Sequence, residues 1–145
     1  MAHPTLACAH CGATNRIPAE RFADNPLCGR CKHPVFSGEP IDASEANFRS
    51  LVEQSSIPVV VDFWASWCGP CKQFAPVFRE AASRWEPKVR MVKVNTESAP
   101  ALAQRFGIRS IPTLMVFKQG REVKRLSGAM PPNQFDQWLL GTLNQ

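Results

Sequence analysis

The pattern of hydrophobic and polar positions changes near residue 40. Before it, residues 1–33 have short loops around cysteines and little apolar periodicity, which predicts an irregular segment. So short a segment buries too little apolar surface to fold unaided, and a bound metal is the natural remedy. Residues 33–40 (HPVFSGEP) have the proline, glycine and serine content of a linker. We therefore expect two parts, residues 1–37 and residues 38–145.

After residue 40, strand-like and helix-like patterns alternate. Continuous β-branched and apolar runs predict buried strands, and apolar positions three or four apart predict helices with one apolar side. The predicted strands cover residues 58–63, 89–94, 113–117 and 122–126, and the predicted helices cover residues 42–53, 68–85, 99–106 and 131–140. We expect Asp42 to cap the first helix with Glu45 in a capping box, and Pro76 to kink the second. This order predicts an α/β fold with a central sheet and helices on both faces.

Composition fits a globular protein, with 44% apolar and 20% charged residues. The longest apolar run, residues 57–65, is interrupted by Pro58 and Asp62 and is shorter than the ~20 residues of a membrane span. The first residues lack the charged and apolar regions of a secretory signal. We therefore expect a cytoplasmic protein without membrane association, in a compartment that keeps thiols reduced.

The charge of the chain does not predict a nucleic-acid partner. The formal net charge is +5, but residues 1–40 carry only four basic and three acidic side chains. Four thiolates holding one divalent zinc would make that segment about −1. Neither an arginine-rich stripe nor an aromatic platform is present. A mixed, solvated surface is the simpler interpretation, so nucleic acid is not an expected partner.

The six cysteines form three CxxC pairs, and the last pair stands apart. Cys68 and Cys71 follow a predicted buried strand and open a predicted helix. Three residues apart on a first helical turn, they are close enough to form a disulfide, and the helix N-terminus favours a thiolate at Cys68. Cys68 is then the expected exposed nucleophile, and Cys71 the buried thiol that resolves a mixed disulfide. A stable disulfide or half of a metal site remains the alternative.

The other four cysteines, Cys8, Cys11, Cys28 and Cys31, have the CxxC…CxxC spacing of a closed tetrahedral zinc site. Four thiolates leave no open coordination position, so the zinc would be structural. Because bound thiolates can be oxidised with loss of metal, a redox-sensing zinc is a further hypothesis. Iron in a rubredoxin-like site, or two disulfides without metal, are the alternatives. His10 and His33 are interpreted as loop histidines.

Residues 62–72 (DFWASWCGPCK) resemble the active-site segment of the thioredoxin family. The resemblance continues through VKVN at residues 92–95, IPT at residues 111–113, and the glycines at positions 107, 120 and 128. It runs from about residue 40 to the C-terminus. With the four N-terminal cysteines, the whole chain resembles the bacterial zinc-binding thioredoxins of the thioredoxin 2 type, so a thioredoxin fold with a small N-terminal zinc-ribbon-like module is expected.

The resemblance implies roles for individual residues. Asp62 would lie buried below the active site with Lys93 near it, and a carboxylate in an apolar strand has a raised pKa suited to taking a proton from Cys71. Pro112 would follow a cis peptide bond beside the two sulfur atoms. The substrate-binding surface would consist of Trp67, Gly69, Pro70, Ile111 and Pro112.

The resemblance also implies an activity. The central Gly-Pro of the CGPC motif is typical of the reducing members of the family. The expected function is therefore reduction of protein disulfides, with recycling by NADPH-dependent thioredoxin reductase and a role in oxidative stress. The alternative is a zinc-dependent binding or chaperone module that uses the thioredoxin fold as a platform. Retention of biological activity in a Cys68→Ser/Cys71→Ser variant would favour that alternative.

Overall fold

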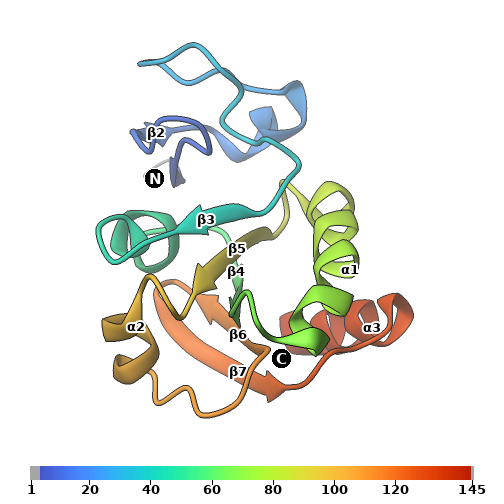
Figure 1. The fold of residues 1–145 in the computed structure, drawn as a ribbon. Coiled ribbons are helices and arrows are strands. Elements are labelled where there is room, and N and C mark those ends of the chain that lie inside the picture. Colours follow the sequence, from blue (N-terminus) through green and yellow to red (C-terminus); the bar gives the residue numbers. More distant parts are fainter. Residues whose placement is uncertain (1–3, 145) are drawn as a thin grey trace.

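A five-stranded mixed sheet forms the centre of the C-terminal part of the chain (Figure 1). The computed structural model describes residues 4–144. In sheet order the strands are β3 (Ile41–Ala43), β5 (Arg90–Asn95), β4 (Val59–Trp64), β6 (Thr113–Lys118) and β7 (Arg121–Ser127). Strands β3, β5 and β4 are parallel, whereas β6 and β7 are antiparallel to their neighbours. The carboxyl ends of the parallel strands therefore share one edge, where β4 leads into the first long helix.

Helices cover both faces of this sheet. They are α1 (Gly69–Trp85), α2 (Pro100–Arg105) and α3 (Pro132–Leu143), with a five-residue π-helical turn, η2 (Arg49–Glu53). Figure 1 shows α1 and α3 on one side of the sheet and α2 on the other. The first side buries Phe74, Phe78 and Phe135, whereas the second buries Phe48 and Phe63. The predicted α/β fold is confirmed. None of the helices within residues 4–144 is long and apolar enough to cross a bilayer.

The predicted helix over residues 42–53 is wrong at its start. Ile41–Ala43 form the edge strand β3, and Asp42 lies in that strand instead of capping a helix. Reciprocal side-chain hydrogen bonds form two residues later, in the turn before η2, because Ser44 Oγ accepts a hydrogen bond from the N–H of Ala46, and Asn47 Oδ1 accepts one from the N–H of Ser44. Backbone pairing with β5 is the tertiary interaction that makes residues 41–43 extended.

Glu45 also has a different partner from the one predicted. Its Oε1 atom accepts a hydrogen bond from the N–H of Ala101 at 2.8 Å, in the first turn of α2. A carboxylate there satisfies one of the unpaired N–H groups of that helix. Helix α1 extends over Gly69–Trp85 with Pro76 inside it. The kink at Pro76 stays a prediction.

The N-terminal part is more regular than predicted. Strands β1 (Thr5–Ala7) and β2 (Thr14–Arg16) form an antiparallel hairpin, and a 3₁₀-helix, η1 (Ala19–Asp24), follows. Its buried residues form a small apolar cluster consisting of Leu6, Cys8, Ile17, Cys28, Val35 and, from the segment before β4, Ile57. Three-residue strands are too short to show a periodic sequence pattern, so only the loops around the cysteines were visible in the sequence.

Backbone and side-chain hydrogen bonds fasten this part to the sheet. Thr5 and Ser56 exchange two of them, from the N–H of Thr5 to Ser56 Oγ at 2.8 Å and from the N–H of Ser56 to the carbonyl of Thr5 at 3.1 Å. Arg90, at the start of β5, donates to the carbonyls of Ala7 at 2.6 Å and Val35 at 2.8 Å. The cysteine loops are thus held against the main domain by specific donors.

Candidate redox and metal sites

A hydrogen-bonded loop places Cys68 at the start of α1. Strand β4 ends at Trp64, whose carbonyl accepts a hydrogen bond from the N–H of Thr96 at 2.8 Å. Two residues on, Ser66 donates to the Glu97 carboxylate from its N–H at 2.9 Å and from its hydroxyl at 2.7 Å. The loop after β5 therefore fixes the loop after β4. Glu97 was not among the predicted site residues, although its place just after the neighbouring strand was a usable signal.

Cys68 is the N-cap residue of α1 and forms a disulfide with Cys71. Their Cα atoms lie 5.2 Å apart, and the N–H of Cys71 donates to Cys68 Sγ at 3.2 Å. Pro70 occupies the first helical turn, where its missing N–H costs nothing. In the reduced protein, the same N–H and the helix dipole would stabilise a thiolate at Cys68.

The disulfide is less accessible than its position predicted. Cys68 is 4% exposed and Cys71 is 3% exposed, whereas the neighbouring Trp67 is 71% exposed. In this disulfide form, both sulfur-bearing residues pack against Ala65 and are bordered by Ile111. The prediction of an exposed Cys68 is therefore wrong for the oxidised state. Trp67 and the loop before β6 lie beside its sulfur.

The loop before β6 supplies the other wall of the site. Cys68 Sγ lies 3.6 Å from the carbonyl oxygen of Ile111, and the Ile111–Pro112 peptide bond is cis. Ile111 is half-buried and Pro112 is buried, while Gly69 and Pro70 are exposed. Sequence positions 68 and 111 are thus brought together at one edge of the sheet. The residues proposed for substrate binding border the disulfide from the helix start and from this loop.

Asp62 is a buried carboxyl group on the α1 side of the sheet. It is 1% exposed, and its Oδ1 atom has no hydrogen-bond partner. Burial raises the pKa of Asp62 to about 7, against the opposing effect of the Lys93 charge. Lys93 is its register partner on β5, and the Lys93 ammonium lies 4.5 Å from the centre of the Trp64 ring. A carboxyl group with a pKa near neutrality can exchange a proton during thiol chemistry.

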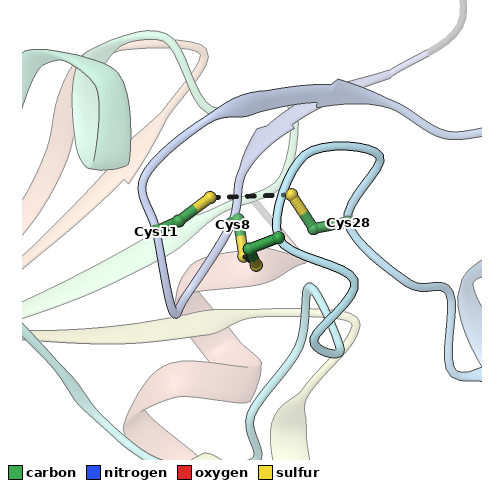
Figure 2. Close-up of side chains that lie close together, drawn as sticks. Cys8, Cys11 and Cys28 are labelled. Carbon is green, nitrogen blue, oxygen red and sulfur yellow. Dashed lines mark hydrogen bonds between the residues drawn. The ribbon is translucent and has the colours of Figure 1, made fainter.

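The four N-terminal cysteines come together as one cluster, and Figure 2 shows Cys11 and Cys28 facing each other from two loops. All four sulfur atoms lie within 4.8 Å of one another. The Cys8–Cys31 sulfur separation is 3.7 Å and that of Cys11–Cys28 is 3.6 Å. Zinc–sulfur bonds of about 2.3 Å in a tetrahedron place sulfur atoms about 3.8 Å apart, whereas a disulfide needs about 2.05 Å. The donor set therefore fits a tetrahedral thiolate-binding metal, and the disulfide alternative does not fit.

Polar groups favour a thiolate at Cys28, whereas burial and the neighbouring cysteines raise the pKa of Cys31 to about 12. Backbone N–H groups of Cys31 and Arg30, together with the Asn15 amide, lower the pKa of the Cys28 thiol to about 5. Asn15 Nδ2 lies 3.4 Å from Cys28 Sγ, and its Oδ1 accepts from the N–H of Gly29 at 2.9 Å. Asn15 was not among the predicted site residues. His10 and His33 stack on each other with ring centroids 3.8 Å apart and are not part of the sulfur cluster.

Comparison with known proteins agrees with this geometry. Residues 39–140 match the family model described as Thioredoxin, and residues 7–33 match the model described as Thioredoxin 2, N-terminal. The predicted division at residues 37 and 38 falls between the two matches and stays a prediction. A protein named Thioredoxin C-3 from Corynebacterium nephridii is 44% identical over 140 residues, which is 97% of this chain and 96% of that protein.

Two further relatives match smaller shares of this chain. Thioredoxin 1 of Synechococcus elongatus is 53% identical over 88 residues, covering 61% of this chain and 82% of that protein. The chloroplastic M-type thioredoxin of Chlamydomonas reinhardtii is 42% identical over 118 residues, covering 79% and 84%. The disulfide at a helix start, the family matches and the near-full-length relative lead to one conclusion. This chain belongs to the thioredoxin family and is a thioredoxin-type thiol–disulfide oxidoreductase with an N-terminal metal-binding cysteine cluster.

Proposed function

We propose that this protein reduces disulfide bonds in other proteins and is itself reduced by thioredoxin reductase with electrons from NADPH. The observation that carries the proposal is the Cys68–Cys71 pair at the N-terminus of α1, beside the cis Ile111–Pro112 bond. The Cys68 thiolate attacks one sulfur of a substrate disulfide, and the other substrate sulfur leaves as a thiolate. Cys71 then attacks Cys68 Sγ, which releases the second substrate thiolate. Two electrons pass to the substrate, and the enzyme is left with its disulfide.

Asp62 supports the second step of this exchange. Cys71 must lose its proton before it can attack, and a buried base with a pKa near 7 can accept that proton at neutral pH. The Lys93 ammonium would offset the negative charge that forms on Asp62. Both residues act on the proton, whereas the sulfur chemistry belongs to the two cysteines. This division of roles rests on the burial of Asp62 and on its register with Lys93.

The substrate segment would lie over the disulfide. Trp67, with 71% of its surface exposed, presents an apolar ring surface beside Cys68. Gly69 and Pro70 leave the approach unobstructed on the helix side, while Ile111 and Pro112 form the opposite wall. An extended peptide could bind there through backbone hydrogen bonds in the manner of an added strand.

The metal is proposed to be one zinc ion held by Cys8, Cys11, Cys28 and Cys31. A closed set of four thiolates supplies stability to the cysteine loops and leaves no position for a substrate. Cys11 is exposed and Cys31 is half-buried, so oxidants could reach two of the ligands. Whether the zinc is structural or redox-sensing is decided by peroxide titration with a chromogenic chelator. Release at low peroxide would identify a sensor, and retention during cycles of oxidation at Cys68 and Cys71 would identify a structural ion.

A cytoplasmic location and a role in oxidative stress complete the proposal. Four cysteines that are not disulfide-bonded agree with a reducing compartment, where thiols remain available to a metal.

The direct test of the proposed reductase activity is reduction of insulin disulfides by the purified protein with NADPH and thioredoxin reductase. We expect turnover with the natural sequence and none with Cys68→Ser. Full activity in Cys68→Ser would refute the proposed function.

A further inference from the structure

Lys93 lies between two aspartates across the sheet. The parallel pairing places Asp42 of β3 opposite Lys93 of β5, and Lys93 opposite Asp62 of β4. Residues in register on neighbouring parallel strands point to the same face, so the three side chains form one row on the α1 side. Asp62 is buried, Lys93 is half-buried and Asp42 is exposed. The row therefore runs from the protein interior to its surface.

Two hollows open this row to solvent. The smaller, of about 240 Å³, is lined by four charged side chains, which are Glu39, Asp42, Arg79 and Lys93. The larger, of about 460 Å³, is also lined by Asp42 and Lys93, together with Trp64. The groups facing the lysine are thus Asp42 from β3, Glu39 from the preceding segment, Arg79 from α1 and Asp62 from β4. Within residues 4–144, Asp42 is the one acidic residue that shares both the strand register and both hollows with Lys93.

In the described part of the chain, Lys93 forms an ion pair with neither aspartate. None of the four ion pairs within residues 4–144 includes Lys93, and its ammonium rests over the Trp64 ring. The position of this charge can therefore respond to the carboxylates on its two sides. A displacement toward Asp62 would stabilise the ionised form of that carboxyl group, and a displacement toward Asp42 would withdraw that support.

We propose that Asp42 is a positioning residue for the disulfide chemistry, because its carboxylate attracts the Lys93 ammonium toward the surface and so weakens the effect of that charge on Asp62. The proposal rests on the function proposed above for Asp62 as the proton acceptor of Cys71. With Asp42 in place, Asp62 keeps its proton up to neutral pH and can exchange it. Without Asp42, the Lys93 charge stabilises only the Asp62 carboxylate. The pKa of Asp62 then falls, and its carboxylate becomes a weaker base.

Both electrostatic effects of Asp42 have the same sign. Removing its negative charge lowers the pKa of Asp62 directly, and it also allows Lys93 to approach Asp62. Two strand spacings separate the aspartates by about 10 Å. At that distance a solvated charge changes a pKa directly by about 0.3, and the approach of Lys93 to Asp62 would bring the total to about 0.7 to 1. This effect is large enough to measure on a single carboxyl group.

The test is a ¹³C NMR titration of the Asp62 carboxyl group in full-length, metal-loaded protein. The disulfide form is used, because Cys68 and Cys71 then carry no titrating thiol. We expect Asp42→Asn to lower the Asp62 pKa by about 0.7 to 1 and Asp42→Glu, which keeps the charge, to leave it close to that of the natural protein. An unchanged Asp62 pKa in Asp42→Asn, with the melting temperature preserved, would overturn the proposal.

Two further variants separate position from general charge. In a Lys93→Met background, Asp42→Asn should lower the Asp62 pKa by less than half as much, because its route through the lysine is gone. Glu39→Gln removes a neighbouring carboxylate that is outside the row, and it should have the smaller effect of the two single variants. An undiminished effect in Lys93→Met, or an equal effect of Glu39→Gln, would show that Asp42 does not act by positioning Lys93.

Measurements of insulin reduction test the positioning role of Asp42 separately from the proposed disulfide-reductase function. The pH profile of insulin reduction should shift its acid limb downward in Asp42→Asn by the same amount as the Asp62 pKa. A lowered pKa with an unmoved profile in an active enzyme would overturn the positioning role in the reaction. Absence of insulin reduction by the natural protein would refute the proposed function, whereas the NMR titration would still decide the electrostatic row.

Discussion

Arg90 and Glu86 form an ion pair inside the molecule, with 3.3 Å between Nε of Arg90 and Oε2 of Glu86 and side-chain exposures of 0% and 3%. The remaining guanidinium nitrogens reach the carbonyls of Ala7 and Val35, and Glu86 Oε1 accepts from the N–H of Gly38 at 2.7 Å. Burying a charge is costly unless every donor and acceptor is satisfied. This pair meets that condition only with the N-terminal part in place.

Arg90→Met is therefore expected to destabilise the whole protein. The variant keeps an unbranched apolar stem, but it leaves Glu86 buried without its partner and two carbonyls without donors. Breaking a buried pair in this way costs about 3–5 kcal/mol of unfolding free energy. Urea denaturation of the metal-loaded protein measures it. Arg84→Met is the matched control, because the Arg84–Asp136 pair is exposed and should contribute at most about 1 kcal/mol. Equal, small losses in both variants would contradict this account of Arg90.

Metal removal should lower the stability of the sheet domain as well as that of the cysteine loops. Thiolate coordination would order the loops, and Ala7, next to Cys8 of the cysteine cluster, belongs to the apolar cluster of the sheet domain. We expect a strong chelator to lower the melting temperature by at least about 5 °C, which corresponds to one or two kcal/mol in a chain of this size. Differential scanning calorimetry measures the change.

The control for metal removal is the Cys68→Ser/Cys71→Ser variant, which retains all four clustered cysteines. It should show the same chelator-induced decrease in melting temperature. If the metal leaves and the melting temperature stays constant, the two parts of the chain are not energetically coupled, and the buried contacts of Arg90 do not transmit stability between them.

The sequence predicted those features whose determinants are local. The spacing of Cys8, Cys11, Cys28 and Cys31 is sufficient to indicate one metal cluster, because a CxxC turn directs both of its sulfur atoms to one point. The strand–CxxC–helix order likewise places Cys68 at a helix N-terminus. Each of these inferences needs only a few neighbouring residues and the geometry of a turn or a helix.

Features that depend on distant contacts could not be predicted in this way. Arg90 lies 83 residues from Ala7 and 55 residues from Val35, and nothing in the local pattern of β5 indicates these partners. Asp42 looks like a helix cap by its neighbours, but backbone pairing with β5 makes its segment extended. The exposure of Cys68 was misjudged for a similar reason, since the loop that borders it comes from residue 111.

Gly120→Ala should destabilise the protein through the backbone of a neighbouring turn. Gly120 has a φ of +78° between β6 and β7, and a Cβ atom there would lie 2.5 Å from the carbonyl oxygen of Glu53. The left-handed conformation and the backbone clash together predict a loss of about 2–4 kcal/mol in unfolding free energy. Gly141→Ala, in α3 with open space around it, should instead stabilise by up to about 1 kcal/mol. Chemical denaturation of both variants measures the contrast, and a neutral Gly120→Ala would show that the turn can shift away from η2.

Asp62→Asn should stabilise the protein at alkaline pH and lose that advantage in acid. Burial raises the pKa of Asp62 from 3.8 to about 7, so the folded protein holds a proton that the unfolded chain releases in this interval. Below pH 4 Asp62 is protonated in both states, so its burial does not change the unfolding free energy with pH. Between pH 4 and 7 the unfolding free energy falls, because the unfolded chain releases the proton and the folded protein retains it. A pKa difference of about 3 corresponds to about 4 kcal/mol, which the asparagine avoids.

The measurement is the unfolding free energy of both disulfide-form proteins across this pH range. The advantage of Asp62→Asn should widen by about 3 kcal/mol between pH 4.5 and 8.5. Metal loss in acid affects both proteins equally and cancels in the difference. Glu80→Gln, which removes an exposed carboxylate from α1, should change stability by less than about 0.5 kcal/mol at either pH. A pH-independent difference for Asp62→Asn would mean that Asp62 keeps an ordinary low pKa in the folded protein, and its carboxylate would then be too weak a base to take the proton of Cys71 by the route proposed here.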